Sequence, residues 1–446
     1  MADKLWQKKT AVDSEIERYT VGRDRELDVY LAPYDILGSL AHITMLKSID
    51  LLTKEELDAL IAELRLIYST TEKGDFKIED GVEDVHSQVE LLLTRKLGDT
   101  GKKIHSGRSR NDQVLVDLKL FMRTEIREIV ELCDELFNAL ITQSNKYKGY
   151  LLPGYTHLQV AMPSSFGLWF GAYAESLVDD LTVLQAAYRV VNRNPLGSAA
   201  GYGSSFPLNR TMTTNLLGFD SMDYNVVYAQ MSRGKTERIL SSAMGAIAAT
   251  ISKFSFDVCL FNSQNFGFIK LPDQYTTGSS IMPHKKNPDV FELTRAKCNK
   301  LQALSYQITL ITNNLPSGYF RDMQLIKESF LPSFSELKDC IRMTTAMIRE
   351  IEVIANIEED DRYKYMFSVE EVNRRTSSGM PFRDAYRQVG IEIEEGKFTP
   401  YKKVEHTHEG SIGNLCNDKI SVLEQQVVDS FDFTRVVAAQ NSLLGR

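Results

Sequence analysis

Residues 278–292 hold the densest group of side chains that could carry out chemistry. The segment opens Gly-Ser-Ser, and Ser279, Lys285 and Asn287 lie close together within it. Asn is a good N-cap and Pro suits the first helical position, so Asn287-Pro288 predicts the start of a helix. Hydrogen-bond donors beside the positive end of a helix stabilise an anion. A mobile loop of this kind can close over a carboxylate and stabilise negative charge that develops on it during a reaction. The alternative is a flexible connector followed by solvated lysines.

A second polar cluster, residues 105–113, immediately precedes the longest helical pattern and contains Ser109, Arg110 and Asn111. Arginine binds carboxylate in a bidentate manner, so these residues are candidates to bind a dicarboxylate. The alternative is a helix cap with surface arginines, within the solvated basic face that begins at Lys102.

A third cluster, residues 154–159, contains Thr156 and His157 in a loop before a proline. Histidine is the side chain best suited to donate or accept a proton near pH 7, so His157 is a candidate acid or base. A purely structural histidine is the alternative. Glu292 is a candidate to orient it, because it lies one turn into the helix predicted to follow residues 278–287, here called the lysine loop.

A fourth cluster lies at residues 316–327. It offers a phenol, a guanidinium, an amide and an ammonium, from Tyr319, Arg321, Gln324 and Lys327. This mixture suits the polar end of an amino-acid-like ligand, and a polar corner between helices is the alternative.

Composition excludes several other classes of function. The net charge of −8 argues against nucleic acid as a main partner. Five dispersed cysteines without a Cys-x-x-Cys pair indicate neither a zinc site nor a disulfide framework. His406 and His408 lack a third ligand nearby, so we predict no metal site, and no cofactor motif is present.

The chain is expected to be soluble and cytoplasmic. Residues 1–6 contain no apolar core of a signal peptide, and no window approaches eighteen uninterrupted apolar residues, so no membrane is predicted as a partner. Hydrophobic residues make up 43% and charged residues 25%, as in ordinary globular proteins.

Four long helices must position these clusters. Apolar residues recur at spacings of three and four over residues 112–147, 164–191, 234–262 and 290–313. These segments run roughly 23–36 residues, against a usual mean of about 11–12. Such lengths suit an extended bundle whose remaining apolar faces meet other subunits.

Shorter helices are predicted near both ends of the chain, at residues 54–68 after a Thr53–Glu56 capping box, and at 369–376 and 382–394. Only residues 217–228 and 397–404 suggest short hairpins. Proline and glycine concentrate in residues 152–163, 194–207 and 271–288, which predicts that the functional residues lie on loops between helices. The fold is therefore predicted to be all-α with three helical domains, residues 1–107, a central long-helix bundle at 108–357, and residues 358–446.

The clusters together resemble the fumarase/aspartase superfamily, and within it the argininosuccinate lyase family. The resemblance rests on residues 106–114, 154–159, 195–201, 278–288 and the Tyr319–Lys327 cluster, in the family's order. It implies an all-helical homotetramer whose subunits meet in the central bundle. Each active site would then be built from segments of three subunits.

The resemblance also implies an activity, the reversible elimination of argininosuccinate to arginine and fumarate in arginine biosynthesis. A Cβ proton is removed and the resulting carbanion is spread into the neighbouring carboxylate. Ser279 is then the base, Lys285 and Asn287 stabilise the carbanion, and His157, oriented by Glu292, is the acid. The implied ligands of the substrate are Ser109, Arg110, Asn111 and Thr156 for its succinyl carboxylates and Tyr319, Arg321, Gln324 and Lys327 for its arginine end.

Several positions depart from the family pattern, namely Ala32, Val89, Leu91, Gly234 and Arg321. By resemblance they lie mostly around the amino-acid end of the substrate. A lyase for another N-succinyl adduct, such as adenylosuccinate, and a non-catalytic structural relative therefore remain as alternatives.

Overall fold

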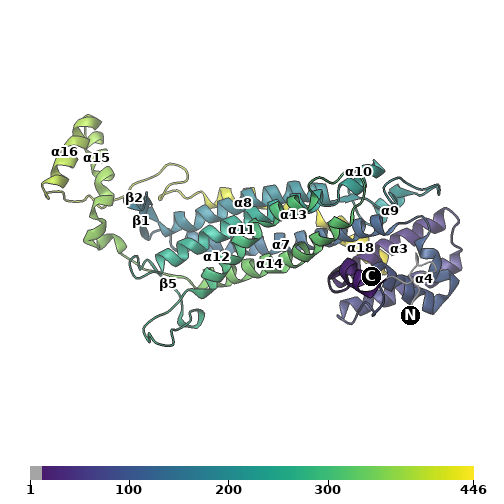
Figure 1. Cartoon of the computed structure of the whole chain (residues 1–446). Coiled ribbons are helices and arrows are strands. Elements are labelled where there is room, and N and C mark those ends of the chain that lie inside the picture. The colour runs from purple at the N-terminus through teal and green to yellow at the C-terminus, as the bar shows by residue number, and fades with distance from the viewer. Residues whose placement is uncertain (1–12) are drawn as a thin grey trace.

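A computed structural model describes residues 13–446 and has an elongated, mainly helical shape (Figure 1). Its middle is a bundle of long helices, α7 (Arg110–Lys146), α8 (Phe166–Val191), α11 (Lys235–Phe261), α12 (Asp289–Gln302), α13 (Leu304–Thr312) and α14 (Ile326–Glu350). The predicted all-α fold with a long-helix core is confirmed.

Helix α7 sets the length of the bundle. It has 37 residues, which at about 1.5 Å per residue span roughly 55 Å. It begins at a capping box, in which the Asp112 carboxylate accepts the Ser109 N–H and the Ser109 hydroxyl accepts the Asn111 N–H. Apolar side chains such as Ile126 and Phe137 bury one face of α7 in the bundle core. The helix therefore carries the chain from one end of the molecule to the other.

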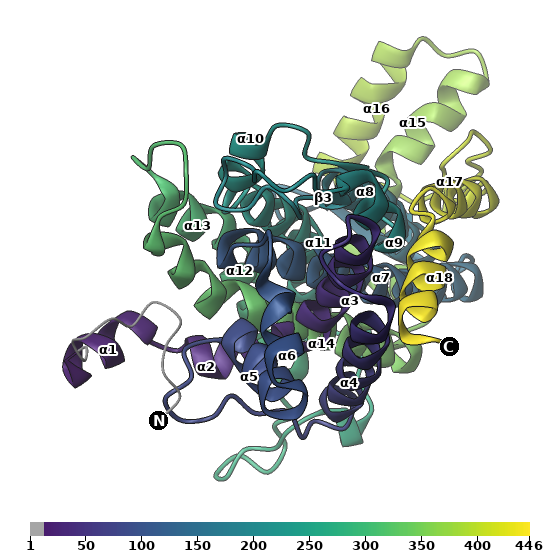
Figure 2. The ribbon, with the colours of Figure 1, turned by 90° about the vertical axis from the view of Figure 1, so that its right-hand side faces the viewer.

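Short helices lie across one end of the bundle, as the view along it shows (Figure 2). They are α1 (Ser14–Val21), α2 (Asp24–Leu27), η1 (Asp28–Leu31), α3 (Ala32–Ser48), α4 (Lys54–Glu72), α5 (Val85–Leu97), α6 (Asp99–Lys102) and η2 (Lys103–His105). A second core joins α3, α4 and α5 to the first turns of α7. The predicted helix after Thr53 and its capping box with Glu56 are confirmed.

The opposite end of the bundle carries the β1–β2 and β5–β6 strand pairs and a projecting helical pair (Figure 1). The antiparallel strands β1 (Leu151–Thr156) and β2 (Gln159–Ser165) form a hairpin, and β5 (Ile269–Lys270) pairs with β6 (Glu352–Val353). Beyond them lie η3 (Asp273–Tyr275), η5 (Ile357–Glu359), η6 (Asp361–Phe367), α15 (Ser368–Ser377) and α16 (Phe382–Glu394). The last two confirm the helices predicted in this part of the chain.

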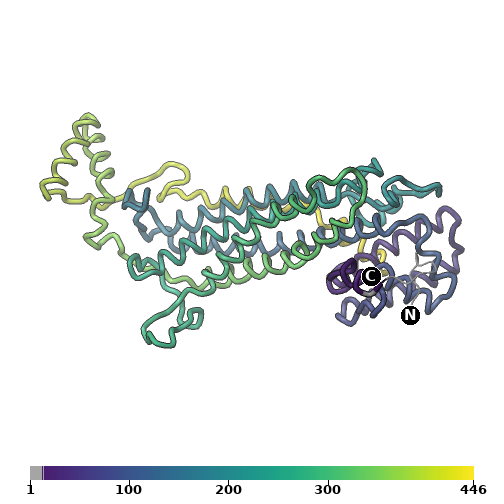
Figure 3. Tube along the Cα trace, in the orientation of Figure 1, coloured from purple at the N-terminus to yellow at the C-terminus, as the bar shows by residue number. Residues whose placement is uncertain are grey.

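The C-terminal segment returns along the bundle, as the trace in Figure 3 shows. Helix α17 (Asn417–Asp429) packs on α8, and α18 (Phe433–Leu444) packs on α3 and α9 (Arg210–Leu216). The Arg65 guanidinium donates to the Leu443 carbonyl at 2.8 and 3.0 Å. Along the chain, the segment between α8 and α11 also contains α10 (Val226–Met231) and the parallel two-residue strands β3 (Arg193–Asn194) and β4 (Ser221–Met222). The domain boundaries at 107/108 and 357/358 stay a prediction.

The long-helix predictions hold for α7, α8 and α11 and fail in two respects elsewhere. The single helix predicted over residues 290–313 is wrong, because the helical bonding is interrupted at Ala303, whose N–H bonds to the Lys300 carbonyl three residues back. Helix α14 was not predicted, and it contains Pro332, a residue that ordinarily ends helices.

Both predicted hairpins are wrong. Residues 221–222 form a parallel strand with residues 193–194, and residues 397–404 have no partner strand. The hairpin that exists, β1–β2, lies in a segment interpreted as a proline- and glycine-rich loop, and its two prolines, Pro153 and Pro163, face each other across it.

The helix after the lysine loop begins one residue later than predicted. Asn287 is not its N-cap, because its backbone N–H and carbonyl pair with Thr277. Pro288 occupies the cap position instead and Asp289 is the first helical residue.

Among described helices, α11 alone is long and apolar enough to suit a membrane, with mean hydropathy 1.4 in its most apolar window. It packs against α8 and α12 inside the bundle. The N-terminal residues 1–6, considered above for a signal peptide, lie outside the described residues.

Candidate active site

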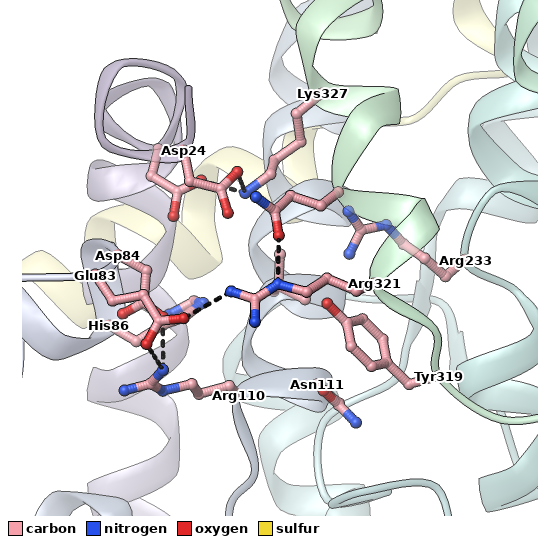
Figure 4. A pocket seen from close by; sticks show the side chains of 13 residues that line it. Asp24, Glu83, Asp84, His86, Arg110, Asn111, Arg233, Tyr319, Arg321 and Lys327 are labelled. Atoms are coloured by element: carbon pink, nitrogen blue, oxygen red, sulfur yellow. Dashed lines mark hydrogen bonds and ion pairs between the residues drawn. The ribbon is translucent and has the colours of Figure 1, made fainter. Parts of the chain in front are cut away.

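A cavity of about 260 Å³ opens where α7 begins (Figure 4). Side chains from the start of α2, the loop before α5, the first turn of α7 and the start of α14 meet there. The cavity is lined by Asp24, Asp28, Glu83, Asp84, His86, Arg110, Asn111, Val114, Arg233, Tyr319, Arg321, Gln324 and Lys327. Four carboxylates and four permanent cations thus face one another, a lining that suits a ligand with charges of both signs.

Lys327 lies at the inner corner of this pocket between two aspartates. Its Nζ is 2.6 Å from carboxylate oxygens of both Asp24 and Asp28. Burial favours the neutral amine, but Asp28 and Asp24 outweigh it and raise the pKa of Lys327 above its ordinary value. Burial also raises the pKa of Asp24 to about 6, against the opposing effect of Lys327. This corner therefore contains both carboxylates that can bind a cationic group and an ammonium that can bind an anionic group.

The short turn η4 (Arg321–Leu325) supplies the wall beside this corner. The Arg321 guanidinium donates to Gln324 Oε1 at 3.1 Å and to a Glu83 carboxylate oxygen at 2.9 Å. Gln324 donates in turn to the carbonyls of Thr20 and Val21, both at 3.0 Å. Tyr319 lies next to Arg321 and is 39% exposed, so its phenol remains accessible to a ligand (Figure 4).

Arg110, the first residue of α7, forms the opposite wall. Its guanidinium lies 3.0 Å from Glu83 and 3.2 Å from Asp84 and donates to the Ser87 hydroxyl at 2.8 Å. Burial opposes the charge on Arg110, but Asp84 and Glu83 outweigh it and raise its pKa. Asn111 follows on α7 and also lines the pocket, whereas Ser109 caps the helix.

A buried network fixes the pocket wall from behind. His86 Nδ1 lies 2.8 Å from an oxygen of Asp35 and 3.5 Å from one of Asp117, and all three side chains are buried. Burial disfavours the imidazolium, but Asp35, Asp117 and Asp84 outweigh it and raise the pKa of His86 to about 9. His86 is therefore charged at neutral pH and offsets the acids around it.

These three residues also form the one group among residues 13–446 whose potential metal-ligand atoms lie within 4.8 Å of one another. The sequence predicted no metal site. A proton on His86 accounts for the short contact with Asp35. Burial and the neighbouring Asp35 raise the pKa of Asp117 well above its ordinary value, against the opposing effects of His86 and Arg108. Within this group the Asp35 carboxylate is paired with the charged His86.

The lysine loop leaves the bundle between β5 and α12, near the end that carries the β1–β2 hairpin (Figure 1). The backbone pairing of Thr277 with Asn287 closes its base. Within the loop, the Ser279 hydroxyl oxygen accepts the N–H groups of Met282 at 3.1 Å and Ile281 at 3.4 Å. Two backbone donors on one hydroxyl favour its deprotonated form. Lys285 is exposed in the same loop.

His157 lies at the tip of the β1–β2 hairpin. It and Leu158 form the two-residue turn between the paired residues Thr156 and Gln159, with φ values of 54° and 55°. Positive φ at both positions is typical of a type I′ turn, where Asn and Gly are the usual residues. Thr156, His157 and Leu158 are all exposed. The hairpin thus presents an imidazole to the surroundings of the chain.

Comparison with known proteins decides the family. A family model described as a lyase matches residues 1–303. The chain is 72% identical over 444 residues to an argininosuccinate lyase of Parabacteroides distasonis and 71% identical over 446 residues to one of Bacteroides thetaiotaomicron, with 100% of each chain covered. It is also 39% identical over 389 residues to an argininosuccinate lyase of Thermotoga neapolitana, covering 87% of this chain and 98% of that one. The chain belongs to the argininosuccinate lyase family.

Solved structures share the fold of this argininosuccinate lyase family member. An EDDS lyase in complex with formate aligns with a TM-score of 0.74 at 20% identity, covering 97% of this chain and 95% of the other. A class II fumarase from Schistosoma mansoni aligns with a TM-score of 0.72 at 16% identity, covering 98% and 96%. The likeness extends over almost the whole chain.

Six of the thirteen predicted site residues gather in one pocket, and the other seven lie elsewhere. The pocket contains Arg110, Asn111, Tyr319, Arg321, Gln324 and Lys327. The residues outside it are Ser109 at the cap of α7, Thr156 and His157 on the hairpin, Ser279, Lys285 and Asn287 on the lysine loop, and Glu292 exposed on α12. His157 is exposed at the hairpin tip and Glu292 is exposed on α12, so their pairing stays a prediction.

The predicted groups are separated by the length of the bundle helices. Roughly 55 Å of α7 lie between Arg110 and the chain leading to His157. Helices α12 and α13, with 14 and 9 residues, place roughly 35 Å between the lysine loop and the segment leading to Tyr319. In a member of the argininosuccinate lyase family these groups can meet only across different subunits or after a large rearrangement.

Five pocket acids and bases were missed by sequence reasoning, together with Arg233. They are Asp24, Asp28, Glu83, Asp84 and His86. A local signal for some of them exists, because residues 83–86 place three titratable groups just before a helix and Asp24 and Asp28 are spaced four apart. Their role in forming the pocket depends on contacts with residues hundreds of positions away.

The departures from the family pattern lie mostly outside the pocket. Of the five positions only Arg321 lines it. Ala32 and Val89 are buried in the core of the short helices, and Leu91 is half-buried. Gly234 has φ 76°, and a Cβ there would lie 2.5 Å from Thr312 Cγ2, so glycine is required by the backbone at the start of α11.

Proposed function

We propose that the protein catalyses the reversible elimination of argininosuccinate to arginine and fumarate. The pocket that combines Lys327, Asp24 and Asp28 with Arg110 and Arg321 carries this proposal, because argininosuccinate bears an amino-acid end and two further carboxylates. Full-length relatives at about 70% identity bear the name of this enzyme. The proposed setting is arginine biosynthesis in the cytoplasm.

In the proposed reaction Ser279 Oγ takes the Cβ proton. The electron pair of the broken C–H bond moves into the adjacent carboxylate, which becomes a dianionic aci-carboxylate. Lys285 and Asn287 stabilise this charge, and one well-placed donor of this kind contributes about 2.7–4 kcal/mol. The Met282 and Ile281 amides that face Ser279 Oγ support its role, since they lower the cost of an alkoxide.

The second half of the reaction breaks the carbon–nitrogen bond. The electron pair returns from the aci-carboxylate to form the double bond of fumarate, and the guanidino nitrogen leaves with the electrons of the C–N bond. His157, oriented by Glu292, gives that nitrogen a proton directly or through water. The exposed position of His157 at a hairpin tip supports delivery of this group to another subunit's site.

The proposed ligands divide between the two ends of argininosuccinate. Ser109, Arg110, Asn111 and Thr156 hold the succinyl carboxylates. Tyr319, Arg321, Gln324 and Lys327 hold the arginine end, with Lys327 on its α-carboxylate. To these we add Asp24 and Asp28 as acceptors for the α-ammonium, because their carboxylates already bind the ammonium group of Lys327.

We further propose that the enzyme is a homotetramer whose active sites are shared between subunits. The separation of Arg110, His157 and Ser279 along the bundle helices supports shared sites. Exposed apolar side chains on the bundle helices, such as Phe256, Leu293 and Leu310, support an assembly through the bundle.

One assay tests the substrate. Argininosuccinate, adenylosuccinate, malate and aspartate are offered separately to the full-length protein, and fumarate is followed by its ultraviolet absorbance. We expect turnover with argininosuccinate alone. Activity confined to adenylosuccinate would replace the substrate while keeping the elimination, and no activity with any of the four would support a non-catalytic relative.

A further inference from the structure

The Glu83 carboxylate bridges the two arginines on opposite walls of the pocket. One oxygen lies 2.9 Å from the Arg321 guanidinium and the other lies 3.0 Å from that of Arg110 (Figure 4). The Glu83 side chain is only 12% exposed, whereas that of Arg321 is 52% exposed. The buried Glu83 carboxylate therefore holds the more exposed Arg321 guanidinium in a position that spans the pocket.

This bridge has the form that a ligand carboxylate would take. A carboxylate held by guanidinium groups through both oxygens is the arrangement by which arginine recognises carboxylate ligands. Glu83 supplies that carboxylate from the chain itself, and it lies where the cations proposed to bind substrate meet. An incoming carboxylate must share these donors with Glu83 or replace it.

Replacement leaves neither arginine without a partner. Arg110 keeps its contacts with Asp84 at 3.2 Å and with the Ser87 hydroxyl at 2.8 Å. Arg321 keeps Gln324 at 3.1 Å. The contact between Glu83 and Arg321 is consequently the one that can open with the least disturbance of the pocket, because Arg321 is the more exposed partner and lies on a short turn.

We propose that Glu83 is a competing internal carboxylate that sets the affinity of the pocket for its substrate. Glu83 neutralises Arg321 in this structure, and substrate binding exchanges the carboxylate of Glu83 for a carboxylate of the ligand. This inference rests on the proposed function, because it takes argininosuccinate as the ligand. It adds to that function a residue that weakens binding and so limits how tightly substrate and product are held.

Steady-state kinetics of Glu83→Gln with argininosuccinate test the proposal. The amide keeps the shape of the side chain and removes its charge. We expect KM to fall about three- to tenfold, the range that loss of one part-exposed ion pair produces, with kcat changed less than about twofold. Should this variant fail to fold, Glu83→Asp serves instead, since a side chain one methylene shorter cannot bridge both arginines, and the same fall in KM is expected.

The matched control is Glu79→Gln. Glu79 binds Arg95 through both carboxylate oxygens, at 2.6 and 2.9 Å, outside the pocket. We expect its KM to equal that of the wild type. A fall in KM for both variants would indicate a general effect of net charge and would overturn the proposal.

A double-mutant cycle with Arg321→Gln identifies the partner through which Glu83 acts. In the Arg321→Gln background, Glu83→Gln should change KM by less than about twofold, because the guanidinium for which Glu83 and the substrate compete is absent. An unchanged or raised KM for Glu83→Gln in the otherwise native enzyme would show that Glu83 only braces the pocket. A wild-type enzyme inactive on argininosuccinate would instead refute the proposed function, so the two failures are distinguishable.

Discussion

The His86 imidazole and the Asp35 carboxylate form a buried hydrogen bond of 2.8 Å between residues 51 positions apart. The bond ties α5 to α3, and the second contact of His86, with Asp117, ties both to α7. Glu83 and Asp84 immediately precede α5, so the same bond fixes the acidic wall of the pocket. Stability of the fold and shape of the pocket are thus linked through one charged histidine.

Replacing His86 by Gln should remove a pH-dependent part of the free energy of unfolding. The folded-state pKa of about 9 lies above the ordinary value of 6.5. The protonated imidazole therefore stabilises the fold fully below about pH 6.5, and this stabilisation is lost as pH rises through about 9. We expect His86→Gln to lose about 2–4 kcal/mol at pH 7 and to approach the wild type near pH 10.

Urea unfolding of both proteins between pH 6 and pH 10 measures this difference. The exposed His408 provides a control, since His408→Gln should follow the wild-type curve throughout. A His86→Gln deficit of constant size across the whole range would mean that the loss comes from packing and not from the charge.

Asp24 should make substrate binding sensitive to mild acid. Burial raises its pKa to about 6, and we have proposed that its carboxylate accepts the substrate's α-ammonium. Protonation removes that acceptor, so KM for argininosuccinate should rise about tenfold as pH falls from 7 to 5. Asp24→Asn should have a raised KM at pH 7 and a flatter profile below it.

The surface residue Asp58, which pairs with Lys54, is the control for this profile. Asp58→Asn should reproduce both the KM and the pH dependence of the native enzyme. If Asp24→Asn retained the acid-dependent rise in KM, the titrating group would be another residue.

Ser279→Ala should abolish turnover without unfolding the protein. Ser279 is half-buried in a mostly exposed loop and contributes to no core, whereas a base in the proton-transfer step is worth about 10²–10⁴-fold in kcat. We expect a loss of that size together with an unchanged melting temperature and an unchanged oligomer by size-exclusion chromatography. The adjacent Ser280→Ala variant should retain most of the native rate, and the reverse pattern would move the base to Ser280.

Sequence reasoning predicted most of the helical fold because helical periodicity is a local signal. Helices α7, α8 and α11 carry an uninterrupted pattern, and α4 begins at a capping box visible in four residues. The pattern fails where local rules and tertiary packing disagree. Pro332 lies inside α14, and Pro153 and Pro163 lie opposite each other in the β1–β2 hairpin, so ordinary breakers occur within regular structure.

The pocket was only half predictable for the same physical reason. The basic and neutral pocket residues that were predicted lie in polar clusters at the ends of long helices, where the density of polar side chains is itself a local signal. Its acids become meaningful through contacts over very long separations, such as Glu83 with Arg321, which are 238 positions apart, and Asp28 with Lys327, which are 299 apart. No local sequence pattern indicates that these residues are in contact. None indicates that Arg110 and His157 lie at opposite ends of α7, with His157 on the hairpin that follows it.

That separation leads to a prediction about mixed oligomers. Asn111→Ala disables the pocket and His157→Asn disables the hairpin, and each variant alone should be nearly inactive. If a site takes its pocket from one subunit and its hairpin from another, oligomers formed from both variants contain some sites in which both Asn111 and His157 are native. Random mixing would restore roughly a quarter of the sites.

The measurement is argininosuccinate turnover after the two variants are unfolded together and refolded, compared with the sum of the two refolded separately. Activity well above that sum supports shared sites. Refolded mixtures that assemble to the native size but remain inactive would require Asn111 and His157 of one chain to reach a common site. The roughly 55 Å span of α7 would then have to be bridged by a rearrangement of the bundle, and the proposed shared sites would be wrong.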